Sequence, residues 1–190
     1  THTITYTFTE FDCSDFCTFT IQVIPGSVTQ TINFLTGWNW ISFNVLPVTP
    51  TVANTMANFT PATGDQLKNQ TQLFTWSGTQ WLPPNQNIDP DKTYLLKTSK
   101  PAGSFVVTNT AGNYVQVNDP INVSANGWTW IGYKPRVQLS PAQAFVSMAG
   151  TFTNQDQIKN QTSIATFNAG TGTWLLPSFK MNPGSGYKLK

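Results

Sequence analysis

Few side chains of this sequence are suited to acid–base or nucleophilic chemistry. The chain of 190 residues contains one histidine, His2, and eight acidic residues. His2 lies in the terminal segment, so no serine or cysteine has a base that a folded core would hold in place. Asp65 and Asp156 occupy the same place in a repeated segment, which indicates the same turn or cap hydrogen bonding twice. We therefore predict that the protein is not an enzyme, because nucleophile, base and orienting group do not come together.

The two cysteines, Cys13 and Cys17, are separated by Ser-Asp-Phe. Two ligands are too few for a zinc site, and the spacing is not that of a C-x-x-C redox motif. We favour a small-loop disulfide formed in an oxidising compartment, with a pair of free thiols as the alternative. The acidic segments at residues 12–15 and 89–91 have too few oxygen ligands for a dedicated calcium loop. Surface turns are expected there, and we predict no metal and no cofactor.

Charged residues are scarce in this chain. They make up 9% of the sequence, against about a quarter in an ordinary soluble domain. The net charge of +2, without a Lys/Arg cluster along the sequence, argues against nucleic acid and against anionic membrane surfaces. No apolar run approaches the roughly 20 residues of a membrane helix, so membrane insertion is not expected. The chain begins with Thr1, as a processed exported product would, although a shortened chain would begin in the same way.

The strongest internal pattern is a duplication in which four blocks recur in the same order, roughly ninety residues apart. The pairs are INFLTGWNWISF from Ile32 and INVSANGWTWIGY from Ile121, DQLKNQT from Asp65 and DQIKNQT from Asp156, WLPP from Trp81 and WLLP from Trp174, and PDKTYLLK ending at Lys97 and PGSGYKLK ending at Lys190. Each copy predicts a strand with G-W-x-W-I, a short helix, a middle strand (residues 73–76 or 164–167) and a closing strand. The helices are expected to start at Thr49-Pro50 and Ser140-Pro141, because a hydroxyl N-cap followed by proline is typical there.

The order of these blocks resembles a repeat that is common in secreted, multidomain surface proteins of bacteria, especially Bacteroidota-like organisms. The resemblance covers residues 30–98 and 119–190. It implies an exported, β-rich module without catalytic activity. The first copy departs from the pattern, since Asp91-Lys92-Thr93 replaces the Gly-Ser-Gly of the second, and we expect a different turn there.

The seven tryptophans suggest carbohydrate binding as a rival function. Two pairs, Trp38 with Trp40 and Trp128 with Trp130, lie on strands whose two faces are both apolar, so we expect them to be buried in the domain or at a subunit contact. The tryptophans nearer to turns are the better candidates for stacking on a glycan: Trp76, Trp81 and Trp174. N-x-[ST] sequons occur at Asn58, Asn69, Asn122 and Asn160, and a glycan on any of them would require exposure to solvent.

Further strands are predicted outside the repeats. Residues 16–24 alternate in polarity, and residues 105–117 are expected to form a hairpin around Thr-Ala-Gly. The predicted fold is mainly β, an incomplete Ig-like β-sandwich plus two repeated β-rich units that each carry one short helix. The corresponding domains are an arm (1–11), Ig-like strands flanking the first repeat (12–118) and the second repeat (119–190).

The first ten residues have the alternation of a β-strand. Threonine fills every odd position from 1 to 9, and the even positions hold His2, Ile4, Tyr6, Phe8 and Glu10. This strand could pair within its own domain, but an apolar, β-prone segment left unpaired is an aggregation hazard. Pairing with a neighbouring molecule resembles, in kind, the donor-strand exchange of pilins, although no pilin motif is matched. Repeated head to tail, such pairing builds a filament.

The sequence therefore predicts a structural subunit of an extracellular, pilus-like fibril, at the cell surface or shed from it. Identical copies would polymerise through the donor-strand side chains of His2, Ile4, Tyr6 and Phe8. A secreted carbohydrate-binding or adhesion module is the alternative, with glycans as partners and no nucleic acid.

Overall fold

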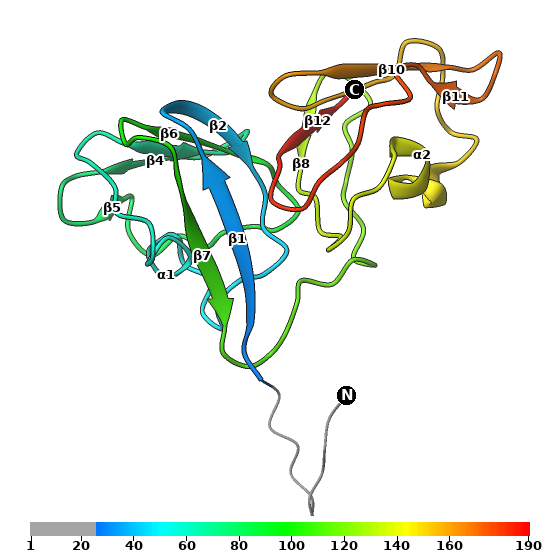
Figure 1. Ribbon diagram of the computed structural model, residues 1–190. Coiled ribbons are helices and arrows are strands. Elements are labelled where there is room, and N and C mark those ends of the chain that lie inside the picture. Colours follow the sequence, from blue (N-terminus) through cyan, green and yellow to red (C-terminus); the bar gives the residue numbers. More distant parts are fainter. Residues whose placement is uncertain (1–25) are drawn as a thin grey trace, which may run out of the picture.

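The structure is a computed structural model that describes residues 26–190 (Figure 1). The predictions for the donor strand, for residues 16–24 and for Cys13 and Cys17 lie outside the described residues. The described chain is mainly β, as predicted, with two five-stranded antiparallel sheets and one two-stranded antiparallel ribbon. The sheets belong to the two repeats, which form two units that lie side by side.

The first unit contains one sheet, one short helix and the ribbon. The sheet has the order β2-β6-β3-β4-β5 and the ribbon pairs β1 with β7. Its elements are β1 (Val28–Phe34), β2 (Gly37–Ile41), α1 (Val52–Thr55), β3 (Gln66–Lys68), β4 (Leu73–Trp76), β5 (Trp81–Leu82), β6 (Tyr94–Thr98) and β7 (Gly103–Asn109).

The second unit repeats this sheet with the equivalent order β8-β12-β9-β10-β11. Its elements are β8 (Thr129–Ile131), α2 (Pro141–Ala144), a 3₁₀ turn (Val146–Met148), β9 (Gln157–Lys159), β10 (Ile164–Asn168), β11 (Thr173–Trp174) and β12 (Tyr187–Leu189). The duplication read from the sequence is thus a duplication of structure, with one short α-helix in each unit.

The helix start is predicted correctly in the second unit and two residues too early in the first. The side chain of Ser140 accepts a hydrogen bond from the backbone N–H of Gln143, in a capping box with Pro141 at the first helical position. In the first unit the cap is Thr51, whose side chain accepts from Asn54. Pro50 cannot belong to that helix because its carbonyl accepts a hydrogen bond from the N–H of Ile88.

The ribbon covers the core of the first unit (Figure 1). All seven residues of β1 pair with β7, from Val28 opposite Asn109 to Phe34 opposite Gly103. The ribbon buries Ile32, Phe105 and Val107 in the core. Phe59, which follows α1, packs against the ribbon side chains Phe34 and Phe105 with ring centroids 5.3 and 5.4 Å apart.

The expected hairpin within residues 105–117 is wrong. Only its first half is a strand, and β7 pairs with β1 instead. The Asn109 side chain ends β7 because its Oδ1 accepts hydrogen bonds from the backbone N–H groups of Ala111 and Asn113. Val115 then donates to the carbonyl of Asn44, so the second half of the predicted hairpin runs against the first unit as irregular chain.

Candidate functional site

The two units join through hydrogen bonds that occur in reciprocal pairs. Ser42 N–H donates to the Gly184 carbonyl at 3.1 Å, and its counterpart Gly132 donates to the Asp91 carbonyl at 2.8 Å. In the same way Gly186 N–H donates to the Trp40 carbonyl at 2.9 Å, and Thr93 N–H to the Trp130 carbonyl at 3.3 Å. The junction therefore has approximate two-fold symmetry within one chain, like an isologous dimer contact.

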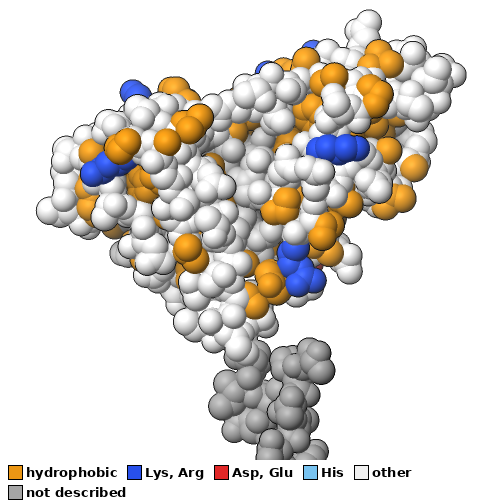
Figure 2. Space-filling model, in the orientation of Figure 1, with side chains coloured by type: hydrophobic (Ala, Val, Ile, Leu, Met, Phe, Trp, Pro, Cys, Tyr) orange, Lys and Arg blue, Asp and Glu red, His pale blue; other side chains and the backbone are white. Residues whose placement is uncertain are grey.

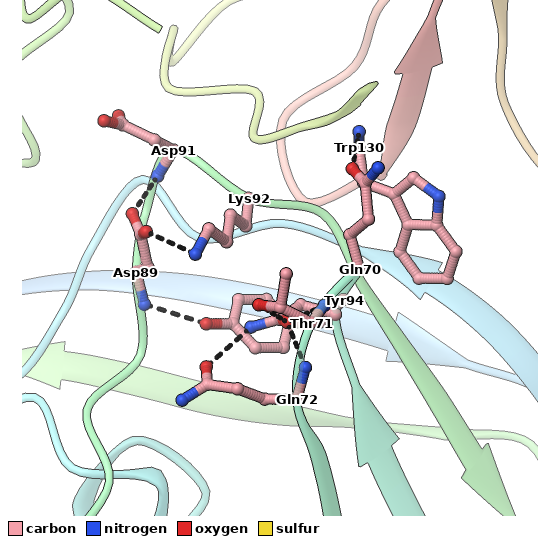
Figure 3. Close-up of polar contacts among 9 residues, drawn as sticks. Gln70, Thr71, Gln72, Asp89, Asp91, Lys92, Tyr94 and Trp130 are labelled. Carbon is pink, nitrogen blue, oxygen red and sulfur yellow. Dashed lines mark hydrogen bonds and ion pairs between the residues drawn. The ribbon is translucent and has the colours of Figure 1, made fainter. Parts of the chain in front are cut away.

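Two glutamines complete this junction by capping the edge strands β2 and β8. Gln161 of the second unit donates to the Trp38 carbonyl at 2.7 Å and accepts from the Trp40 N–H at 2.9 Å. Gln70 of the first unit makes the same pair of bonds to Trp128 and Trp130, at 2.9 and 3.0 Å, and Figure 3 shows its amide turned toward the Trp130 backbone. Each side-chain amide therefore takes the place of a neighbouring strand and closes an otherwise open edge.

The symmetry is broken where side chains meet at its centre. A Cβ added to Gly186 would lie 2.5 Å from Cγ2 of Thr93 and 3.0 Å from the backbone of Ile41. Gly186 and Thr93 are counterparts in the two repeats, so the junction has room for one side chain at this position and not for two. This gives a physical reason for the departure at residues 91–93 of the first copy: Thr93 donates its hydroxyl to the Ile131 carbonyl and accepts from the Tyr187 N–H.

The four strand tryptophans are not core residues, which corrects the expectation of burial within the domain, while burial at a subunit contact stays a prediction. In β2 the side chains of Asn39 and Ile41 point into the core, and Trp38 and Trp40 lie on the outward face. Trp38 is 37% exposed, and Trp40, Trp128 and Trp130 are half-buried. The outward faces of the two sheets therefore carry aromatic rings on both sides of the junction.

Lysine side chains lie over these rings. The ammonium of Lys188 is 4.3 Å from the ring centroid of Trp40 and 3.7 Å from that of Trp130, so it links the two units. Farther out, Lys68 lies 4.6 Å from Trp38 and Lys159 lies 4.0 Å from Trp128. We call the four tryptophans together with Lys68, Lys159 and Lys188 the Trp–Lys row.

Burial, with a further contribution from the positive charges of Lys159 and Lys68, lowers the pKa of Lys188 to about 8. The ion pairs found in residues 26–190 join Lys92 to Asp89 (Figure 3) and Lys134 to Asp91, and neither involves this row. On the described part of the face seen in Figure 2, Lys and Arg side chains are visible and Asp or Glu side chains are not.

The core of the second unit is less well covered than that of the first. Counted from the helix caps Thr51 and Ser140, Met56 and Phe59 correspond to Phe145 and Met148. The first two are buried, with 2% and 4% exposure, whereas their counterparts are half-buried. Within residues 26–190 the second unit has no ribbon like β1–β7, and nothing in the described chain covers its helix as that ribbon covers Phe59.

An apolar cavity opens at this place. It has a volume of about 310 Å³ and is lined by Phe145, Phe152, Phe167 and Trp174 together with small residues. Beside it Val146 is 72% exposed. Figure 2 shows hydrophobic side chains at the surface of the right-hand lobe, which is the second unit. We call Phe145, Val146, Met148, Phe152 and Trp174 the uncovered face.

The turn tryptophans predicted to stack on glycans have different environments. Trp81 is 3% exposed and packs edge-on against Trp76 with ring centroids 5.6 Å apart, so it presents no open face to a sugar ring. Its counterpart Trp174 is half-buried and lines the apolar cavity. Trp76 is also half-buried. The structure therefore removes Trp81 from the glycan candidates and places Trp174 on the uncovered face.

The asparagines of the four sequons differ in their exposure to solvent. Asn69 is 4% exposed, and its Oδ1 accepts from the N–H groups of Thr71 and Gln72, so it has no room for a glycan. Asn160 makes the same turn with Thr162 and Ser163. Asn58 and Asn122 lie at the surface. The repeated sequons are thus explained as a turn motif in both units.

Asp65 and Asp156 have the shared turn role that the sequence predicts. The Asp65 carboxylate accepts from the N–H groups of Ala62 and Ser99 and from the Thr98 hydroxyl, and Asp156 accepts from the N–H of Thr153. Burial raises the pKa of Asp65, but these hydrogen bonds together outweigh it and hold the pKa below its ordinary value.

Comparisons of the chain with protein-family models, with curated proteins and with solved structures found no match. The resemblance to repeats of bacterial surface proteins therefore stays a prediction. Among residues 26–190 there is no group of three or more metal-ligating side chains, and no helix there has the length and apolar character needed to cross a bilayer.

The sequence did not predict the junction between the two units. Gln70 and Gln161 stand at the same place in the two KNQT segments. Their recurrence was the available signal, but a sequence repeat does not reveal that each copy contacts the other.

Proposed function

We propose that the protein is a structural subunit of an extracellular, pilus-like fibril, in which residues 1–10 of one copy dock as a strand on the second unit of the next copy. The observation that carries this proposal is the difference between the two units. The first has a ribbon over its helix and core, and the second has the uncovered face at the equivalent place.

The sequence alone favours an acceptor formed by residues 16–24 and a hairpin within residues 105–117, in an incomplete Ig-like sandwich. The acceptor proposed here is a different one. A hairpin within residues 105–117 does not form, and β7 is already paired with β1. The edges of β2 and β8 at the junction are capped by Gln161 and Gln70. The uncovered face combines the exposed Val146 and half-buried aromatic side chains with a cavity of about 310 Å³, which suits an aromatic side chain such as Phe8 or Tyr6.

The donor sequence matches this face in chemical character. Ile4, Tyr6 and Phe8 share one face of the expected strand, and threonines fill the other. Full burial of one such apolar side chain stabilises an interface by about 1.5–3 kcal/mol. The β-strand would supply backbone hydrogen bonds in addition, as in other cases of strand addition.

A pair of complementary variants tests the proposal. One lacks residues 1–10, and the other carries Val146→Glu, which places a charge on the uncovered face at a position already exposed in the monomer. We expect each variant alone to remain monomeric in analytical ultracentrifugation. Mixed at equal concentration, they should form a dimer and no longer species, because the mixture has one intact donor and one intact acceptor.

Ala57→Glu is the matched control, because Ala57 is the exposed counterpart of Val146 in the first unit. It should assemble as the unaltered protein does, into filaments visible by electron microscopy. If the protein stays monomeric at every concentration while deletion of residues 1–10 lowers its stability, the segment docks within its own chain and the proposal is wrong.

A further inference from the structure

We propose that the Trp–Lys row is a binding surface for an acidic polysaccharide, one that carries carboxylate or sulfate groups on its sugar rings. This inference does not depend on fibril assembly, because all of its residues belong to residues 26–190 of a single chain.

The row continues across the junction, with tryptophan rings and lysine side chains in both units. Lys188 lies between Trp40 of the first unit and Trp130 of the second. On either side of it, Lys68 lies over Trp38 and Lys159 over Trp128. Gln70 and Gln161 fix the backbones of these tryptophans from the opposite unit, so the spacing of the rings is set by the fold. A preorganised row of this kind suits an extended ligand with a repeating structure.

The charge of the row favours an anion. Lys68, Lys159 and Lys188 are close enough that the first two lower the pKa of the third, and within residues 26–190 no carboxylate forms an ion pair with any of them. Mutual repulsion and partial burial are unfavourable for the ammonium of Lys188 in the free protein. A bound carboxylate or sulfate would relieve this repulsion and form charge-assisted hydrogen bonds.

The surroundings of the row favour a sugar as the carrier of that charge. A cavity of about 300 Å³ lies beside Trp40 and is lined by amide and hydroxyl side chains of both units, among them Asn33, Asn160, Gln161 and Thr162. Such groups exchange hydrogen bonds with sugar hydroxyls, while an indole face that no lysine covers packs against the apolar face of a pyranose. A single-stranded nucleic acid also combines flat groups with negative charge, and it is therefore included in the test.

Binding should depend on pH through Lys188. Within residues 26–190 the charged groups that act on it are Lys159 on β9 and Lys68 on β3, while β2 and β8 present Trp40 and Trp130, which do not titrate in this range. An anion stabilises the charged form of Lys188 and raises its pKa. The affinity should consequently be highest below pH 8 and should fall as the pH rises from 8 to 10.

The experiment uses the full chain and measures binding by calorimetry and by tryptophan fluorescence, at low salt and at pH 7. The probes are alginate, which carries one carboxylate on each sugar, uncharged dextran and oligo-dT. We expect binding to alginate that weakens with added salt, and at least tenfold weaker binding to dextran and to oligo-dT.

Lys188→Leu is the decisive variant, because it introduces the residue that the first unit already has at the equivalent position, Leu95. It should reduce alginate affinity about tenfold or more and remove the fall in affinity above pH 8. Lys180→Leu, at an exposed lysine outside the row, should change the affinity less than twofold. Circular dichroism would establish that both variants fold.

Three results would overturn the proposal. The first is equal binding to alginate and dextran, and the second is tighter binding to oligo-dT than to alginate. The third is an equal loss of affinity in Lys188→Leu and Lys180→Leu, which would mean that net charge alone attracts the polymer.

Discussion

At the scale of single residues, the two faces of the expected donor strand should differ in importance. Replacing Phe8 by Asp places a charge where the proposal requires an apolar side chain. It also removes the stabilisation of about 1.5–3 kcal/mol that full burial of the phenyl ring would give the interface. We expect Phe8→Asp to abolish filament formation and Thr5→Asp only to weaken it, as followed by light scattering and electron microscopy. Equal effects of the two substitutions would mean that the segment does not dock as a strand.

Asp65 is the residue whose titration should affect stability most clearly. Because its pKa is lowered from the ordinary value of 3.8, its carboxylate stabilises the folded state above that pH. The stabilisation is lost as the pH falls below 3.8 and through the lowered pKa of the folded state. Asp65→Asn should cost about 1–3 kcal/mol at pH 7, since a charged hydrogen-bond acceptor is lost, and less at pH 2–3.

Urea denaturation at pH 7 and at pH 2.5 measures this difference. Asp156→Asn is the matched control in the second unit, where, within residues 26–190, Thr153 alone donates hydrogen bonds to the carboxylate. A cost for Asp65→Asn that stays constant between the two pH values would contradict the assigned role.

At the scale of elements, the sequence predicted the units well and their boundaries less well. The strand of G-W-x-W-I, the middle strands and the cap at Ser140 follow from local chemistry, namely alternation, β-branched residues and a hydroxyl before proline. The prediction of a hairpin within residues 105–117 was wrong because the partner of β7 is β1, which lies about seventy residues earlier in the sequence. Burial of Trp38 and Trp40 within the domain was predicted wrongly because the lysines that accompany them come from other strands.

The glutamine caps give a prediction for the edge strands. Gln161→Leu removes two hydrogen bonds to β2. We expect the free energy of unfolding to fall by about 1 kcal/mol in total, which is little for two hydrogen bonds, because the site is exposed to solvent. The uncapped edge should also promote self-association that increases with concentration. Urea denaturation and sedimentation measure the two effects.

Gln70→Leu should behave in the same way at β8, whereas Gln80→Leu, at an exposed glutamine before β5, serves as the control for added surface hydrophobicity. Self-association of the Gln80 variant to the same degree would show that the leucine, and not the open edge, is responsible.

At the scale of the whole molecule, close packing at the junction should hold the two units together. A Cβ at Gly132 would lie 1.9 Å from the Pro90 carbonyl oxygen, so Gly132→Ala must displace the backbone of the opposite unit. We expect a loss of about 3 kcal/mol or more, visible as a lower melting temperature. Ser42→Ala, at the counterpart position, removes the hydroxyl that donates to the Ser185 carbonyl and should cost only about 1 kcal/mol. A Gly132→Ala variant as stable as the unaltered protein would refute this account of the junction.

The single side chain at the centre of the junction also determines which units can associate. Two copies of the first unit would bring two threonines together where Gly186 now gives Thr93 its space. Two copies of the second unit would place glycine against glycine and would lose the hydroxyl that bonds to Ile131 and Tyr187. Thr93 therefore discriminates against pairing between the like units of neighbouring molecules. In a crowded array of identical chains, each first unit is directed to a second unit, and the covalent connection favours the second unit of its own chain. The remaining surfaces stay available for contacts with other molecules.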